Sequence, residues 1–113
     1  RRPRGAGPLL RDALQPRVPG LQGAWSFGAV AEKTDAAQSD IDVMLVGKNL
    51  SLAKVLELLL PVEEQLGRKI NPTCYTPAEF ARRRAEPDSF VNRVLAQPVL
   101  PLIGELHEPS RAG

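Results

Sequence analysis

The sequence predicts an α/β or α+β fold in which a small mixed β-sheet is flanked by helices. The first observation is length, since 113 residues can bury one hydrophobic core but not two. The second is order, because strand-like segments alternate along the chain with helix-like segments. The third is composition: 42% of the residues are hydrophobic but only 4% are aromatic, so the core must be aliphatic, and 9 Gly with 11 Pro indicate short elements.

The first part of the chain predicts one short helix and two strands. Residues 1–8 are rich in Arg, Gly and Pro, and we expect the end of a linker or a disordered terminus there. Residues 9–14 predict a helix that ends at Pro16. Residues 41–46, Ile-Asp-Val-Met-Leu-Val, predict a strand that is buried on both faces. Residues 21–27 alternate as a strand does, with one face formed by Leu21, Gly23, Trp25 and Phe27.

A long helix is predicted over residues 52–66, with Ser51 as its N-cap and Gly67 as its C-terminal stop. Its apolar residues recur with the i, i+3, i+4 spacing of an amphipathic helix. Pro61 lies inside this segment and should kink or split the helix. Because residues 58–60 are three consecutive leucines, the helix is apolar nearly all round. This favours a second contact surface, and hence a homodimer or a partner domain.

The last part of the chain predicts two more strands and two more helices. Residues 69–75 predict a strand, and Pro72 places it at a sheet edge or a bulge. Thr76, Pro77 and Glu79 form a capping box that opens a helix extending through Arg84. A further helix should open at Pro87, with an apolar side, and a short strand should follow at 99–103. That apolar side is expected to contain Phe90, Val91, Val94 and Leu95. We expect residues 9–104 to form the domain and residues 105–113 a flexible tail.

Composition excludes several classes of site. One cysteine, Cys74, excludes an internal disulfide and a cysteine-based zinc site, and one histidine, His107, excludes a two-histidine metal site. No apolar run approaches 18 residues, and no signal peptide is visible, so a cytoplasmic protein is expected. The net charge of +2 allows nucleic-acid binding without arguing for it. Arg82, Arg83 and Arg84 are most simply a solvated helix face.

Two aspartates are the residues with the clearest chemical potential. Asp40 and Asp42 begin the apolar strand, and strand alternation directs both side chains to the same face, roughly 6–7 Å apart. Two carboxylates this close repel each other, and a divalent cation removes that cost. Oxygen ligands of this kind suit Mg²⁺ or Mn²⁺ bound together with the phosphates of a nucleoside triphosphate. The alternative interpretation is structural, with Asp40 capping a turn and Asp42 solvated.

Residues 27–46, with Ser-Asp-Ile-Asp at 39–42, resemble the signature of the polymerase-β-type nucleotidyltransferase superfamily. Residues 67–73 and 75–80 resemble the second half of its minimal prokaryotic branch, whose domain often follows a winged-helix DNA-binding domain. The resemblance implies a nucleotidyltransferase fold, Mg²⁺ or Mn²⁺ on Asp40 and Asp42 as the catalytic pair, and transfer from ATP to a hydroxyl acceptor. It also implies a nucleotide-binding set formed by Gly28, Ala29, Lys33 and Ser39.

Four residues depart from the family pattern. Ala29 stands where the family has a turn serine, Glu32 and Lys33 replace a basic-Gly pair, and Asn71 occupies the position of a third carboxylate. A neutral amide binds Mg²⁺ more weakly than a carboxylate and cannot act as a base. Two hypotheses therefore stand: an active nucleotidyltransferase, or a catalytically degenerate nucleotide- or metal-sensing domain that accompanies a DNA-binding transcriptional regulator.

Two other residue types have a structural and a functional interpretation. Trp25 and Phe27 could stack on a base, but aromatic residues on one strand face are more often part of the core. Cys74 alternates with Ile70 on a predicted strand, which favours a buried, inert thiol over a reactive one.

Overall fold

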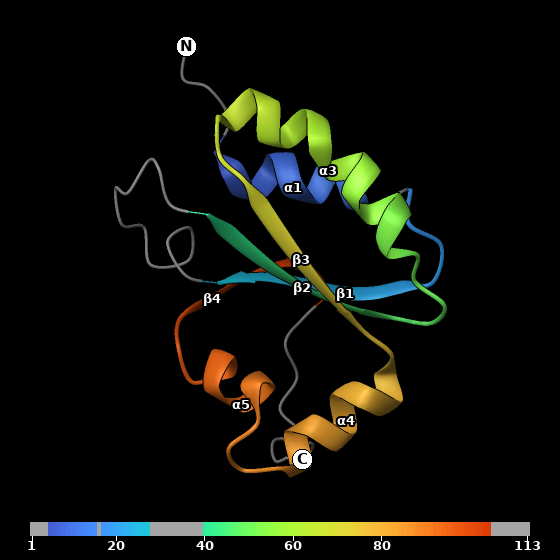
Figure 1. Ribbon diagram of the computed structural model, residues 1–113, viewed down its shortest axis with the longest axis vertical. Coiled ribbons are helices and arrows are strands. Elements are labelled where there is room, and N and C mark those ends of the chain that lie inside the picture. The colour runs from blue at the N-terminus through green and yellow to red at the C-terminus, as the bar shows by residue number, and fades with distance from the viewer. Residues whose placement is uncertain (1–4, 16, 28–39, 105–113) are drawn as a thin grey trace.

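The computed structural model describes residues 5–15, 17–27 and 40–104, and the statements below concern these residues. Helices and strands interleave along the chain, as the sequence predicts (Figure 1). In chain order the elements are α1 (Ala6–Leu14), β1 (Leu21–Phe27), β2 (Ile41–Gly47), α3 (Leu52–Leu66), β3 (Ile70–Tyr75), α4 (Pro77–Ala85), α5 (Phe90–Leu95) and β4 (Val99–Ile103).

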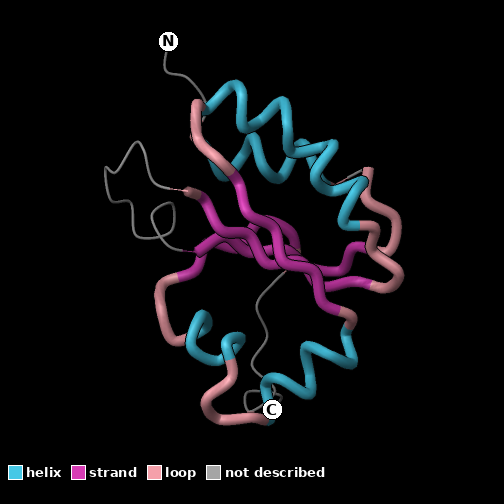
Figure 2. Tube along the Cα trace, in the orientation of Figure 1, coloured by secondary structure: helices cyan, strands magenta, loops and turns pink. Residues whose placement is uncertain are grey.

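The strands form one mixed sheet with the order β3-β2-β1-β4. β1 runs antiparallel to both β2 and β4, whereas β2 and β3 are parallel and are joined by α3. The helices α1 and α3 cover one face of the sheet, and α4 and α5 cover the other (Figure 2). The fold is therefore the helix-flanked mixed sheet that the sequence predicts.

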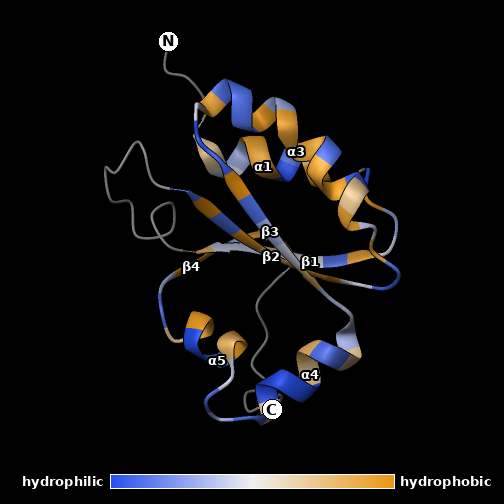
Figure 3. Ribbon diagram, viewed as in Figure 1, coloured by the Kyte–Doolittle hydropathy of each residue, from blue (hydrophilic) through white to orange (hydrophobic). Residues whose placement is uncertain are grey.

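Each face of the sheet carries its own apolar cluster, because successive side chains of a strand point to opposite faces. Ile41, Val43 and Leu45 of β2 join the cluster beneath α1 and α3, while Met44 joins the cluster beneath α4 and α5. All four side chains are buried, so β2 is covered on both faces as expected. Some of the apolar residues of α1 and α3 (coloured by hydropathy in Figure 3) are buried in the first of these clusters, among them Leu10, Leu14, Val55 and Leu59.

The helix α3 has the ends that the sequence predicts. The Ser51 hydroxyl accepts a hydrogen bond from the Lys54 backbone N–H at 3.1 Å. Gly67 ends the helix in the left-handed conformation, with φ of 66°, which a residue without a Cβ adopts readily. The expected split at Pro61 does not occur, since one helix runs from Leu52 to Leu66. Pro61 lies on the exposed side, where water can serve the carbonyl that loses its partner.

The strand β3 is an edge strand, as Pro72 predicts. The Lys69 carbonyl accepts a hydrogen bond from the Ile41 N–H, so the next N–H along the chain, that of Ile70, points to the free edge. At this edge, Glu63 Oε2 accepts a hydrogen bond from the Ile70 N–H at 2.7 Å. Pro72 lies two residues further along and has no N–H. The other edge strand, β4, also contains a proline, Pro101.

Three local expectations are corrected. The first helix begins at Ala6, so residues 6–8 are helical and do not belong to a linker. The helix α5 begins at Phe90 and not at Pro87, because the Ser89 hydroxyl accepts the Asn92 N–H and serves as its N-cap. Leu21 packs against the α1/α3 cluster and not beside Trp25, since an irregularity in the pairing between Leu21 and Gly23 shifts the alternation of β1. Within the described ranges, no helix is long and apolar enough to cross a membrane.

Candidate functional site

The two aspartates lie at the beginning of β2, as the sequence predicts. Asp40 immediately precedes the strand and is exposed, whereas Asp42 is the second residue of the strand and is half-buried. Because Ile41 and Val43 point toward α1 and α3, strand alternation places Asp42 on the opposite face, the one covered by α4 and α5. The expected pair of neighbouring carboxylates is therefore present at one end of the sheet.

Asn71 of the neighbouring strand completes this group. The parallel register of β2 and β3 pairs Asp42 with Asn71 and Ile41 with Ile70. The Asn71 side-chain amide donates a hydrogen bond from Nδ2 to Oδ2 of Asp40 at 3.0 Å. Asn71 therefore lies beside both aspartates, at the position that the family resemblance gives to a third carboxylate.

The pKa of the Asp42 carboxyl is raised above its ordinary value. Burial is the main cause, because a carboxylate that loses water is disfavoured, and the charge of Asp40 acts in the same direction. A hydrogen bond from the Asn71 side chain lowers the pKa and partly offsets both effects. The two aspartates thus repel each other, and one amide donor reduces the repulsion.

This donor set fits a small divalent cation. Mg²⁺ and Mn²⁺ favour oxygen ligands, and Mg²⁺ in nucleotide sites takes one or two carboxylates together with phosphate oxygens and water. Asp40 and Asp42 supply two carboxylates whose mutual repulsion a cation would relieve. Among the described residues, no group of three or more His, Cys, Asp or Glu side chains could hold a metal. A cation held by these two carboxylates would take its remaining ligands from phosphates and water.

The other site residues implied by the family resemblance lie outside the described part of the chain. They are Gly28, Ala29, Glu32, Lys33 and Ser39. His107, to which the sequence assigns no ligand partner, also lies outside it.

The aromatic residues divide into a buried and an exposed set. Trp25 and Phe27 are buried, which confirms their interpretation as core residues. Trp25 stacks on Phe80 of α4, with ring centroids 5.7 Å apart. Phe90 is different: it is 44% exposed and meets Phe27 edge to face, with ring centroids 6.1 Å apart. The sequence predicts it on the apolar side of its helix, and the ring is only partly covered there.

Phe90 also lies near the aspartates, which the sequence does not reveal. Phe27 ends β1 and is the cross-strand partner of Asp42. Residues directly opposite each other in an antiparallel pair share a face, with Cβ atoms about 5 Å apart. Phe27 thus contacts the exposed ring of Phe90 and is paired with Asp42. No sequence signal identifies this proximity, because it depends on how α5 packs beneath β1.

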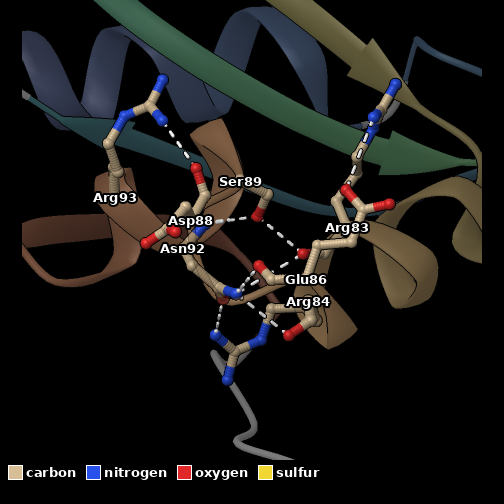
Figure 4. A network of polar contacts seen from close by, with 7 residues as sticks. All are labelled: Arg83, Arg84, Glu86, Asp88, Ser89, Asn92 and Arg93. Carbon is tan, nitrogen blue, oxygen red and sulfur yellow. Dashed lines mark hydrogen bonds and ion pairs between the residues drawn. The ribbon is translucent and has the colours of Figure 1, made fainter.

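Asn92 fixes α5 against the end of α4 (Figure 4). Its Nδ2 donates to the backbone carbonyls of Arg84 at 3.0 Å and Glu86 at 2.7 Å, and its Oδ1 accepts from the Arg84 guanidinium. The Ser89 hydroxyl donates to the Arg83 carbonyl at 2.6 Å. These bonds satisfy carbonyls at the end of α4 and hold the first turn of α5 in place.

The expectation of a solvated basic helix face holds for two of its three arginines. Arg82 and Arg83 are exposed, whereas Arg84 is partly buried and bonds to Asn92. Arg83 also lies 3.7 Å from the Glu86 carboxylate. Cys74 is partly buried, and burial raises the pKa of its thiol, which supports the inert interpretation.

Sequence comparisons identify no relative, whereas structural comparisons identify several. No protein-family model matches the chain, and no curated protein matches it. A chain of a toxin–antitoxin complex with AMP-PNP superposes with a TM-score of 0.63 and 18% identity, over 88% of this chain and 73% of that one. A chain of a complex of tri-AMPylated Shewanella oneidensis HEPN toxin with MNT antitoxin gives a TM-score of 0.57 and 18% identity, over 88% and 71%.

A third similar structure is a mutant of the toxin–antitoxin pair MntA–HpeT, in which two aspartates two positions apart are replaced by glutamate. It gives a TM-score of 0.55 and 19% identity, over 86% of this chain and 68% of that one. At these identities the likeness concerns the fold. The chain has the polymerase-β-type nucleotidyltransferase fold of these proteins.

Proposed function

We propose that this chain is a nucleotidyltransferase domain that transfers a nucleotidyl group from ATP to a hydroxyl group of a protein partner. The observation that carries the proposal is the pair of carboxylates at the start of β2, on a nucleotidyltransferase fold, with the pKa of Asp42 raised by burial and by Asp40. Two carboxylates that repel each other in the free protein are suited to bind a cation and the phosphates that accompany it.

Each residue has a defined part in this proposal. Asp40 and Asp42 hold Mg²⁺ or Mn²⁺, which when bound neutralises charge that develops on the phosphates. The triphosphate is held by Gly28, Ala29, Lys33 and Ser39, as the family resemblance implies. The acceptor oxygen forms a bond to the α-phosphorus as the bond from that phosphorus to the pyrophosphate oxygen breaks. Pyrophosphate leaves and the hydroxyl proton is released to solvent; the neutral amide of Asn71 cannot act as the base.

The nucleotide and the type of acceptor are inferred from the similar structures. One of them contains AMP-PNP, and another contains an AMPylated toxin together with its antitoxin. A protein hydroxyl as acceptor and a protein as partner follow for this chain by analogy of fold. We place this activity in the cytoplasm, where the single, partly buried Cys74 would stay reduced.

A second function, a degenerate nucleotide or metal sensor, is favoured by Asn71. The structure places this neutral amide beside Asp42, so the described part of the site contributes two carboxylates and not three. Fewer anionic ligands lower cation affinity and slow the chemistry. In this alternative the domain keeps nucleotide binding and acts as an interaction module beside a DNA-binding domain.

Calorimetric titration with MgATP, combined with transfer of the α-phosphate label of ATP to a HEPN toxin as trial acceptor, tests the proposal. The wild type should bind MgATP and transfer label, and Asp40→Ala/Asp42→Ala should lose transfer and most of the binding. Glu57→Ala/Glu64→Ala is the matched control, since it removes two exposed carboxylates from α3. This control should behave as the wild type.

The possible results separate the two functions. Binding and transfer that both depend on the aspartates support the enzyme. Binding without label transfer, to the toxin or to the chain itself, supports the sensor. If the wild type does not bind MgATP, both functions are wrong and a scaffold role remains.

A further inference from the structure

We propose that Phe90 is the stacking platform for the nucleobase of the bound nucleotide, an inference that rests on the nucleotide-binding function proposed above. The part of the chain that the structure describes includes all five aromatic residues, and of these five Phe90 is the one with an exposed side chain. Its side chain is 44% exposed although α5 otherwise directs Val91 and Val94 into the core. An exposed aromatic ring next to a nucleotide site offers a flat apolar face, which is what a base requires.

The position of Phe90 relative to the aspartates supports this role. Phe90 contacts Phe27 edge to face, and Phe27 is the direct cross-strand partner of Asp42 on the same face of the sheet. One buried ring therefore connects the two: it contacts the exposed ring and is paired with the aspartate proposed to hold the cation. A nucleotide carries its base one ribose away from the α-phosphate, so a base-binding group is expected at a short distance from the cation.

The Phe90 ring is held in this place by the structure around it. Ser89 caps α5 by accepting the Asn92 N–H at 3.2 Å, and Asn92 ties the helix to the end of α4 (Figure 4). Phe27 supports one side of the ring, and because the ring is 44% exposed, part of it stays free for a ligand. A ring that is already fixed loses little conformational freedom when a base stacks on it.

Binding of MgATP and of magnesium tripolyphosphate tests the role, because the second ligand has the phosphates without a base. Phe90→Ala should weaken MgATP binding at least about fivefold, the lower end of the effect of losing one stacked base. Its affinity for tripolyphosphate should equal that of the wild type. Phe90→Trp should restore ATP binding, since indole has a larger flat face. Phe90→Leu should resemble Phe90→Ala, since leucine is apolar but has no flat face.

Leu56→Ala is the matched control, because Leu56 has a similar exposed fraction, 48%, but lies on α3 across the sheet. It should leave the affinity for both ligands unchanged. Thermal unfolding of each variant shows whether the fold is retained. The inference is overturned if Phe90→Ala binds ATP as the wild type does, or if it weakens both ligands equally. If the wild type binds neither ligand, the nucleotide-binding proposal itself fails, and the role of Phe90 fails with it.

Discussion

The side chain of Asn71 bonds to that of Asp40 at 3.0 Å, although the two residues are 31 positions apart in the chain. The bond joins the start of β3 to the residue that precedes β2, and it uses an amide donor where a third acidic ligand would provide charge. In the free protein, Asn71 thus orients the Asp40 carboxylate, and its hydrogen bonding lowers the pKa of Asp42.

Changing Asn71 should alter cation affinity in a direction that depends on the replacement. Asn71→Leu removes the donor that orients Asp40 and should weaken Mn²⁺ binding by about tenfold, as loss of a supporting hydrogen bond does at metal sites. Asn71→Asp adds a carboxylate and should strengthen Mn²⁺ binding while lowering the thermal stability of the metal-free protein. Electron paramagnetic resonance of free Mn²⁺ measures the affinity.

Thr73→Val is the control for these variants. Thr73 lies two residues along β3 and is also partly buried, but it pairs with Met44 and not with an aspartate. Equal Mn²⁺ affinity in the wild type, Asn71→Leu and Thr73→Val would show that Asn71 has no influence on the cation.

Replacing Asp42 with asparagine should stabilise the protein at neutral pH. The pKa of Asp42 is raised in the folded state, so folding favours the protonated carboxyl, and the carboxylate destabilises the fold at pH values above that pKa. Lowering the pH through the raised pKa should therefore reduce the advantage of Asp42→Asn. We expect a Tm increase of about 2–4 °C at pH 7, kept small by solvent screening of a half-exposed group.

Thermal unfolding of wild type and Asp42→Asn between pH 3 and pH 7 measures this difference. Comparing the two proteins at each pH cancels the titration of the other carboxyls. An advantage that grows as the pH falls would contradict the raised pKa. Mn²⁺ should raise the Tm of the wild type but not that of the variant.

A row of exposed leucines on α3 predicts self-association. Leu52, Leu56 and Leu60 follow each other at four-residue intervals and are 47%, 48% and 53% exposed. Light scattering after size exclusion should therefore detect a dimer at high protein concentration. Leu56→Glu should give a monomer, whereas Gln65→Glu, which adds the same charge at another exposed position of α3, should not. A wild type that stays monomeric at high concentration would contradict the homodimer.

The capping box of α4 should contribute measurably to stability. Thr76 Oγ1 accepts the Glu79 N–H at 3.0 Å, and Glu79 Oε1 accepts the Thr76 N–H at 2.9 Å. Thr76→Ala should cost about 1 kcal/mol, which for a domain of this size lowers the Tm by roughly 4–8 °C. Glu79→Gln keeps an acceptor and should cost much less. Equal Tm values for Thr76→Ala and the wild type would show that the cap is dispensable.

Local signals in the sequence predict most of the fold. The apolar run of β2, the caps of α3 and the capping box of α4 are each encoded by residues within a few positions of one another. The start of α1 cannot be predicted from such local signals, because Gly7 and Pro8 are residue types that usually break a helix. Pro8 is tolerated in the first turn, where its N–H is not needed. At position 7, a contact with a distant residue favours glycine, since a Cβ there would lie 3.1 Å from Leu100 Cδ2.

The candidate site was predictable only in part, because contacts between distant parts of the chain bring some of its residues together. Asp40 and Asp42 are two positions apart, so strand geometry alone places them together. Their proximity to Asn71 depends on the parallel register of β2 and β3, which only the family resemblance suggests. The exposure of Phe90 was not predicted. It is 44% exposed although the next residue, Val91, is fully buried, and both lie on the apolar side that the sequence predicts.

The two edge prolines limit how this protein can assemble. A strand from another molecule needs a free row of N–H donors, and on the outer side of β3 Glu63 already occupies the Ile70 N–H while Pro72 offers none. Pro101 likewise offers no donor in β4. Concentrated solutions should therefore resist fibril growth by strand addition at these two edges, and the exposed face of α3 is the expected surface for complexes.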